Sequence, residues 1–237
     1  MIRPDNRALD QLREIKFTPG FVGCAEGSIL VEIGKTRVLC NATIEDKAPK
    51  WMEKGKSTGW VTAEYNLLPR STAQRTKRER SSISGRTQEI QRLIGRSLRG
   101  VCDLAALKDK TITIDCDVLE ADGGTRTASV VGAFMVLVMA LRTIKTEKKV
   151  LKSWLAATSV GIYKGTPMLD LCYLEDLEAE VDMNVVMTDG GEFVEIQGTG
   201  EESTFSRTQL NSLLELAEIG CKIIIQKQQE LLGAALP

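Results

Sequence analysis

The sequence contains no histidine among its 237 residues. This absence excludes Ser-His-Asp and Cys-His catalytic arrangements, histidine general bases and the common zinc sites that use histidine ligands. Any chemistry must therefore depend on carboxylates, arginines, lysines or hydroxyls, or on a nucleophile that the substrate itself supplies.

Closely spaced cysteine pairs and long apolar runs are also missing. The six cysteines, at positions 24, 40, 102, 116, 172 and 221, show no C-x-x-C spacing. Scattered thiols in a chain whose first residues show no secretory signal are typical of reduced, cytoplasmic proteins. The longest apolar stretch, 128–141, contains Ser129 and Gly132 and is too short to span a bilayer. We therefore expect a cytoplasmic protein with no membrane segment.

The composition, with 43% hydrophobic and 27% charged residues, is typical of a globular protein. The length supports a single large domain over 1–237. The net charge of −1 hides a strong asymmetry, because 69–99 holds nine basic and two acidic residues whereas 165–202 holds eleven acidic and no basic ones. These segments indicate one surface for a polyanion and another for cations or a basic partner, unless the charges only cover solvated faces.

Hydrophobic periodicity predicts an α+β protein in which strands precede helices in each half. The predicted strands are 28–34, 36–45, 59–65, 111–119, 155–163, 167–173, 181–188 and 192–198. Gly34-Lys35 is a two-residue hairpin turn with glycine first. Helices are predicted from the opening at 85–87 to about 102, through the apolar stretch from about 124, and from the capping box of Ser206 and Gln209 towards 232.

The segment Gly123-Gly124-Thr125-Arg126 stands between a predicted strand and the buried helix. Amide groups in the first turn of a helix have no intrahelical partner, and glycine lets the backbone approach a ligand. An arginine in that turn adds a bidentate fork for an oxyanion. The segment is thus either an anion site or a tight turn that eases packing of the helix on the sheet.

Basic residues in two other places could act on the same kind of ligand. Arg86 lies in the first turn of its predicted helix, where it either converges on the same anion or is simply solvated. The cluster Arg70, Arg75, Lys77, Arg78 and Arg80 falls in a polar loop at 71–84 and suits a phosphodiester backbone. A solvated loop, or a contact with the acidic segment of a neighbouring subunit, is the alternative.

Five carboxylates fall within the eight residues 175–182. In one extended strand the end residues would lie roughly 20 Å apart, too far to share an ion. If they cooperate, the chain must turn between them, as in a hairpin formed by 167–173 and 181–188. Paired carboxylates near phosphate would suggest a divalent ion or proton handling, and a solvated acidic turn is the alternative.

Taken together, long stretches of the sequence resemble the RNase PH family, whose members are phosphate-dependent 3′→5′ exoribonucleases that trim tRNA precursors. The matching stretches are R-P-D-N-R at 3–7, A-E-G-S at 25–28, G-W-V-T-A-E-Y at 59–65, L-P-R at 68–70, G-R-T-Q-E-I-Q-R-L-I-G-R-S-L-R at 85–99, D-C-D-V-L-E-A-D-G-G-T-R-T-A-S at 115–129, E-D-L-E-A-E-V-D-M-N-V-V-M-T at 175–188 and E-I-Q-G-T at 195–199. Asn6 stands where family members usually carry glycine, and the loop 71–84 differs in detail.

The resemblance implies a role for each candidate residue. The phosphate-binding residues would be Arg86, Gly124, Thr125 and Arg126. The two essential aspartates would be Asp176 and Asp182, near which related enzymes hold a divalent ion, so Mg²⁺ is expected there. The RNA-binding residues would be Arg70, Arg75, Lys77, Arg78 and Arg80. Glu178 and Glu180 are left as solvated or supporting residues.

The resemblance also implies a fold, an assembly and a reaction. The fold would be the RNase PH type, with two βαβα-like halves (ribosomal protein S5 domain 2-like) and sheets packed against helices, and the chain would assemble as a homohexamer, a trimer of dimers. Inorganic phosphate, the co-substrate, would itself be the nucleophile, which explains why no histidine is needed. RNA ends would be shortened with release of nucleoside 5′-diphosphates. The alternatives are a non-catalytic RNA-binding ring subunit of an exosome-like assembly, and a hydrolytic processing enzyme.

Overall fold

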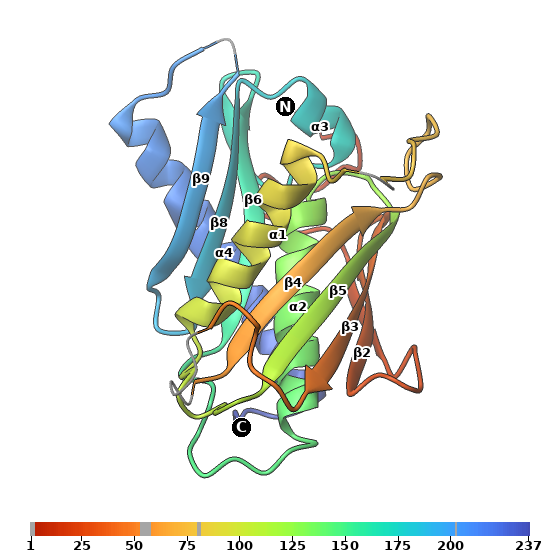
Figure 1. Cartoon of the computed structure of the whole chain (residues 1–237). Coiled ribbons are helices and arrows are strands. Elements are labelled where there is room, and N and C mark those ends of the chain that lie inside the picture. The colour runs from red at the N-terminus through yellow and green to blue at the C-terminus, as the bar shows by residue number, and fades with distance from the viewer. Residues whose placement is uncertain (1–2, 53–57, 80–81, 202) are drawn as a thin grey trace.

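The first half of the chain forms one sheet with two helices (Figure 1). The computed structural model describes residues 3–52, 58–79, 82–201 and 203–237. The elements of this half are β1 (Ile15–Pro19), β2 (Gly27–Ile33), β3 (Thr36–Glu45), β4 (Trp60–Leu67), α1 (Gly85–Gly100), β5 (Thr111–Glu120) and α2 (Thr125–Leu141). The strand order is β1-β2-β3-β5-β4. Strands β4 and β5 are parallel, with α1 as their crossover, and the other neighbours are antiparallel.

The second half forms an antiparallel sheet with one short and one long helix. Its elements are β6 (Leu155–Tyr163), β7 (Thr166–Leu169), α3 (Tyr173–Leu177), β8 (Val181–Thr188), β9 (Phe193–Gly200) and α4 (Arg207–Leu232). The strand order is β7-β6-β8-β9. Ser206 and Gln209 cap α4 reciprocally, so the predicted capping box is confirmed. Among the described residues, no helix is long and apolar enough to cross a membrane.

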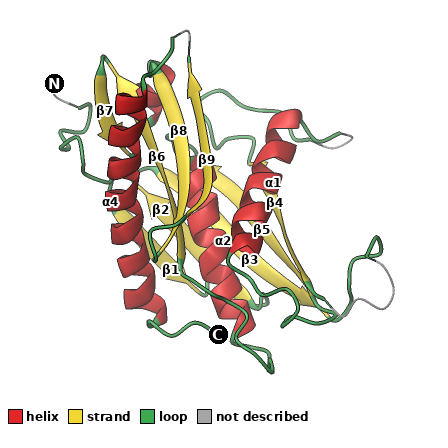
Figure 2. Cartoon of the chain, turned by 90° about the vertical axis from the view of Figure 1, so that its left-hand side faces the viewer, coloured by secondary structure: helices red, strands yellow, loops and turns green. Residues whose placement is uncertain are grey.

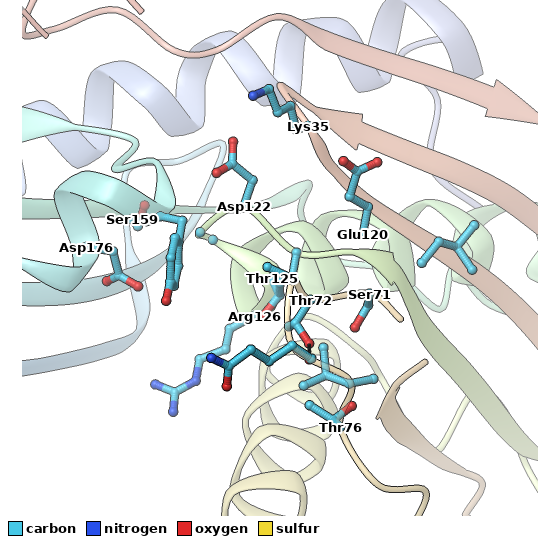
Figure 3. A pocket seen from close by; sticks show the side chains of 18 of the residues that line it. Lys35, Ser71, Thr72, Thr76, Glu120, Asp122, Thr125, Arg126, Ser159 and Asp176 are labelled. Atoms are coloured by element: carbon cyan, nitrogen blue, oxygen red, sulfur yellow. Dashed lines mark hydrogen bonds between the residues drawn. The ribbon is translucent and has the colours of Figure 1, made fainter. Parts of the chain in front are cut away.

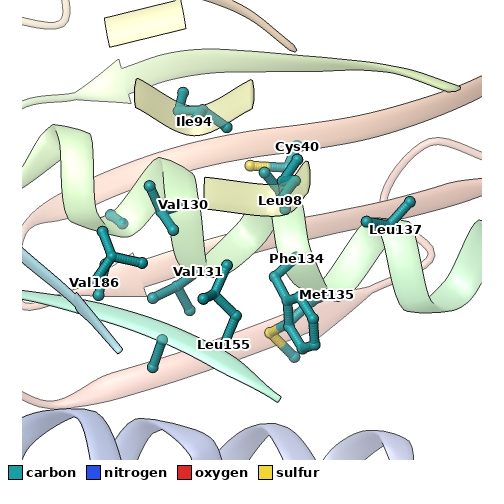
Figure 4. Packing of buried hydrophobic residues seen from close by; sticks show 14 of the residues in the cluster. Cys40, Ile94, Leu98, Val130, Val131, Phe134, Met135, Leu137, Leu155 and Val186 are labelled. Atoms are coloured by element: carbon teal, nitrogen blue, oxygen red, sulfur yellow. The ribbon is translucent and has the colours of Figure 1, made fainter. Parts of the chain in front are cut away.

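Helix α2 is the centre of the molecule, with the two sheets on either side of it (Figures 1 and 2). It is apolar all round, and nearly every residue is buried, as the sequence predicts. Figure 4 shows Phe134 of α2 among side chains from α1, β3, β6 and β8. One hydrophobic cluster therefore joins the two halves, and burial of this apolar surface is the main force that fixes the start of α2.

The α+β class is confirmed, one strand was missed, and two local predictions need correction. Strand β1 was not predicted, because it is a five-residue strand at the edge of the sheet that is only partly buried and ends in Pro19. The predicted strand 167–173 ends at Leu169, because Asp170 adopts a left-handed φ of 54° and turns the chain into α3. The predicted hairpin of 167–173 with 181–188 is also wrong, since β7 and β8 pair with opposite edges of the buried strand β6.

Candidate functional site

A cavity of about 980 Å³ lies where the start of α2, the start of α1, helix α3 and strand β8 meet. Figure 3 shows Asp176 on one side of this cavity and Thr125 with Arg126 on the other. The structure brings seven of the candidate residues to its wall: Arg70, Arg86, Gly124, Thr125, Arg126, Asp176 and Asp182. Of the other loop residues, Arg75, Lys77 and Arg78 are not among the lining residues, and Arg80 lies outside the described part of the chain.

The glycine turn before α2 has a backbone that other residues adopt with difficulty. Gly123 and Gly124 have φ values of 77° and 67°. A Cβ atom on Gly123 would lie 2.6 Å from the carbonyl oxygen of Leu171. Among the described residues no side chain caps the start of α2 at Gly124, and Gly124, Thr125 and Arg126 all line the cavity. The turn thus has the backbone geometry of an anion site, and it packs directly against the segment that leads into α3.

Arg126 is held in place by two side chains that the sequence interpretation missed. Its Nη2 lies 3.0 Å from Glu89 Oε2 of α1, and its Nη1 donates to Gln197 Oε1 of β9 at 3.2 Å. Gln197 Nε2 in turn donates to Glu89 Oε1 at 2.9 Å. The one available signal was that Glu89 is one of only two acids in the basic segment 69–99.

Arg86 lies in the first turn of α1, which Ser84 caps by accepting from the amide of Thr87. Burial raises the pKa of Asp176 and of Asp182, and the charges of Arg86 and Arg126 both oppose this rise. The two guanidinium groups therefore act on the same carboxylates, although they come from different helices. Both arginines line the same cavity, and their convergence on one anion stays a prediction.

The two aspartates come from different elements, Asp176 from α3 and Asp182 from the start of β8. Burial, with a further contribution from the charge of Asp176, raises the pKa of Asp182 to about 6. Partial desolvation also raises the pKa of Asp176, which keeps contact with solvent, and Arg86 and Arg126 oppose this rise. Asp182 is therefore the aspartate that binds a proton more readily.

The other acids of the segment 175–182 have different partners. Glu175 is buried and paired with Arg3. Glu178 is exposed and accepts from the hydroxyl of Tyr163, and Glu180 is exposed and accepts from a backbone amide. The chain does turn between the two aspartates, at 178–180 between α3 and β8, and both line the same cavity.

The R-P-D-N-R segment and the residues that follow it fix the position of α3. Arg3 donates to both carboxylate oxygens of Glu175 at 2.7 Å, and both side chains are fully buried. Arg13 pairs with Asp170 at 2.7 Å and also donates to the carbonyl oxygen of Asp122 in the glycine turn. Asn6, which replaces the usual glycine, has a φ of 60°, a conformation that asparagine tolerates better than most residues.

The fold and the cavity together define an α+β protein in which a glycine turn and two arginines share one cavity with a pair of carboxylates. The model of the 3′ exoribonuclease family, domain 1, matches residues 11–142, and that of domain 2 matches residues 154–220. The chain belongs to this 3′ exoribonuclease family, the RNase PH family.

Curated relatives are similar over nearly the whole chain. The sequence is 54% identical to ribonuclease PH of Syntrophomonas wolfei over 98% of this chain and 100% of the relative. It is 55% identical to ribonuclease PH of Bacillus subtilis over 100% of this chain and 99% of the relative. The similarity therefore extends over both halves of the chain.

Solved structures show the same fold at low sequence identity. Rice Rrp46 superposes with a TM-score of 0.80 at 18% identity, covering 97% of this chain and 100% of that one. A chain of the Archaeoglobus fulgidus exosome with RNA bound to the active site gives a TM-score of 0.81 at 20% identity, covering 95% and 92%. These two comparisons establish the fold alone.

Proposed function

We propose that this protein is a phosphorolytic 3′→5′ exoribonuclease, a nucleotidyltransferase that trims tRNA precursors and other RNA 3′ ends. The observation that carries the proposal is the cavity in which Arg86, Arg126 and the glycine turn face Asp176 and Asp182. Because the chain has no histidine, a nucleophile that is already ionised, such as inorganic phosphate, suits this site. The ribonuclease PH names of relatives at 54% and 55% identity support the same activity.

Inorganic phosphate is the proposed co-substrate, bound by Gly124, Thr125, Arg86 and Arg126. The open amides at the start of α2 and the two guanidinium groups supply donors and positive charge for the oxyanion. A phosphate oxygen attacks the terminal phosphodiester in line. A new bond from that oxygen to phosphorus forms, and the bond from phosphorus to the leaving 3′ oxygen breaks. The products are a nucleoside 5′-diphosphate and an RNA one nucleotide shorter, and fixed donors favour this step by positioning and charge.

Asp176 and Asp182 are proposed to bind Mg²⁺ or to protonate the leaving 3′ oxygen. The described residues contain no cluster of three or more His, Cys, Asp or Glu side chains that could hold a metal. Two carboxylates beside a phosphate site nevertheless fit Mg²⁺, which is usually bound through one or two carboxylates, waters and substrate phosphates. When bound, the ion would neutralise charge on the phosphates.

Asp182, with a pKa of about 6, is the aspartate suited to give a proton to the leaving 3′ oxygen. Metal ligation and proton donation by Asp182 exclude each other in one turnover. Asp182→Asn separates the two roles, since asparagine keeps a ligand oxygen but has no acidic proton. A loss of kcat that extra Mg²⁺ does not restore assigns proton donation, and recovery at high Mg²⁺ assigns ligation.

The loop before α1 is proposed to contact the RNA backbone. Of the candidate residues Arg70, Arg75, Lys77, Arg78 and Arg80, Arg70 lines the cavity, and Arg80 lies outside the described residues. Lys and Arg side chains that neutralise phosphates release counterions, so binding through this loop should weaken with rising salt.

We also propose that the chain is one RNase PH domain that assembles as a homohexamer, a trimer of dimers. A single hydrophobic cluster through both halves supports the one-domain assignment. Light scattering measures the assembly directly. A mass near that of one 26.0 kDa chain at working concentration would contradict the hexamer.

The test of function uses a tRNA with a short 3′ extension, Mg²⁺, and buffers with and without inorganic phosphate. Trimming should require phosphate and release nucleoside diphosphates. Arg126→Ala should raise the KM for phosphate, and Asp182→Ala should abolish turnover while RNA binding persists. Activity that is indifferent to phosphate would refute the proposal.

A non-catalytic RNA-binding subunit of an exosome-like ring is the second candidate, favoured by the likeness in fold to exosome chains. Such a subunit would bind RNA without shortening it under any phosphate concentration. The presence of both arginines and both aspartates in one cavity supports the enzyme instead.

A further inference from the structure

Arg126 enters a closed triangle of polar contacts with Glu89 and Gln197. Each of the three side chains contacts the other two, at 3.0, 3.2 and 2.9 Å. They come from α2, α1 and β9, so the triangle joins the two halves of the chain beside the cavity. A planar guanidinium that is fixed at two nitrogens by groups on different elements loses most of its rotational freedom.

The triangle leaves one donor of the Arg126 guanidinium without a partner among the described residues. Arg126 Nε is buried, and no acceptor for it exists among the residues that the structure describes. Arg126 lines the cavity, and in this orientation its charge already acts on the carboxylates of Asp176 and Asp182. Arg126 thus belongs both to the triangle and to the wall of the cavity, whereas Glu89 and Gln197 are not among the lining residues.

Placing a carboxylate near a site for an anion has a cost. The side chain of Glu89 is 35% exposed, and its negative charge repels phosphate. Glu89 can favour phosphate binding only if it also makes a favourable contribution that is larger than this repulsion. Orientation of Arg126 is the contribution that the contacts supply.

We propose that Glu89, assisted by Gln197, is a positioning residue that orients Arg126 for phosphate. This inference rests on the proposed function, because it assigns phosphate as the ligand of Arg126. Its consequence is that removal of the Glu89 carboxylate weakens phosphate binding even though the site becomes more positive.

The experiment measures the KM for inorganic phosphate and kcat at saturating RNA for Glu89→Ala, Glu89→Gln and Gln197→Ala. We expect Glu89→Ala to raise the KM about fivefold or more, with a much smaller change in kcat. Glu89→Gln should fall between Glu89→Ala and the unmodified protein, because its amide oxygen can still accept from Arg126. Gln197→Ala should raise the KM by less than Glu89→Ala.

Glu195→Ala is the matched control. Glu195 lies on β9, two residues before Gln197, and pairs with Arg96 of α1 at 2.5 Å without lining the cavity. Its removal breaks an ion pair across the same α1–β9 boundary and should leave the KM for phosphate unchanged. An equal rise in this control would show that the boundary, and not the orientation of Arg126, is responsible, and would overturn the inference.

A double-mutant cycle separates positioning from a general effect of charge. In an Arg126→Ala background, Glu89→Ala should no longer raise the KM, because the side chain that it orients is gone. If Glu89→Ala lowers the KM or leaves it unchanged with Arg126 present, the carboxylate only repels phosphate and the inference is wrong. If Arg126→Ala itself leaves the KM unchanged, the proposed phosphate site fails, which is a different result.

A binding measurement without turnover gives an independent readout. Inorganic phosphate should raise the melting temperature of the unmodified protein in the absence of RNA, since a ligand of the folded state stabilises it. The concentration that gives half of this effect should rise for Glu89→Ala about as much as the KM does. A rise in KM without this change would also overturn the inference.

Discussion

The carboxyl group of Asp182 is predicted to destabilise the folded protein at neutral and alkaline pH. Burial, assisted by the charge of Asp176, raises its pKa from 3.8 to about 6. The folded state therefore binds the proton more tightly than the unfolded state does. The free energy of unfolding falls as the pH rises from about 4 through about 6. Above that range the loss of stability is complete.

The magnitude follows from the two pKa values. A difference of about 2 between them corresponds to about 3 kcal/mol at pH 8. Asparagine cannot ionise, so Asp182→Asn should be more stable than the unmodified protein by up to this amount at pH 8 and by little at pH 4. For a chain of this size, the melting temperature at pH 8 should rise by roughly 6–10 °C.

The assay is thermal unfolding at several pH values without phosphate and with a chelator, because a bound ligand would stabilise the ionised carboxylate. Protein concentration is held fixed, since assembly also affects the melting temperature. Glu178→Gln is the control, because Glu178 is an exposed carboxylate of the same segment and its loss should change stability by less than about 0.5 kcal/mol. A melting temperature of Asp182→Asn that is lower at pH 8, or that differs equally at every pH, would refute the reasoning.

Three further predictions concern the turn, the N-terminal segment and the loop. Gly123→Ala should lose phosphorolytic activity, because its Cβ would lie 2.6 Å from the carbonyl oxygen of Leu171 at a φ of 77°; kcat/KM within twofold of the unmodified protein would contradict this. Arg3→Met should cost up to about 3–5 kcal/mol in denaturant unfolding, because it removes the bidentate partner of the fully buried Glu175 and leaves the longer ion pair with Arg7 at 3.7 Å; an unchanged midpoint would show that Glu175 gives up its charge, or relies on Arg7, at little cost. Arg70→Ala should weaken RNA binding and reduce the slope of log affinity against log salt by about one, and an unchanged slope would remove Arg70 from the RNA contacts.

Local patterns in the sequence were sufficient for much of the fold. The apolar stretch 128–141 predicted a helix buried on all sides, and the turn at Gly34-Lys35 predicted a hairpin that the register of Ile33 with Thr36 confirms. Both signals act over a few residues, where periodicity and turn chemistry decide the conformation.

The strand order of the second sheet could not be predicted in the same way. Strand β6 is buried over almost its whole length, so it accepts β7 on one edge and β8 on the other. From the sequence alone, a hairpin between 167–173 and 181–188 would also have brought the carboxylates of the acidic segment together. Instead, the strand ends at Asp170, which has a left-handed backbone. Its carboxylate pairs with Arg7 and Arg13, which are distant in the sequence.

The sequence predicted the charged residues of the candidate site, but not the side chains that hold Arg126 in place. The turn at 123–126 and Arg86 can be recognised from the sequence, because glycine or arginine stands at the start of a predicted helix. The contacts of Arg126 depend on tertiary structure, since Gln197 is 71 residues from it and 108 from Glu89. No local pattern marks a side chain that acts by orienting another one.

The most direct test of the central claim follows the phosphorus atom of the co-substrate. Trimming of an RNA in the presence of ³²P-labelled inorganic phosphate should place one label in the β position of each nucleoside diphosphate released. Release of unlabelled nucleoside monophosphates would mean that water is the nucleophile, and it would contradict the assignment of the glycine turn, Arg86 and Arg126 to phosphate.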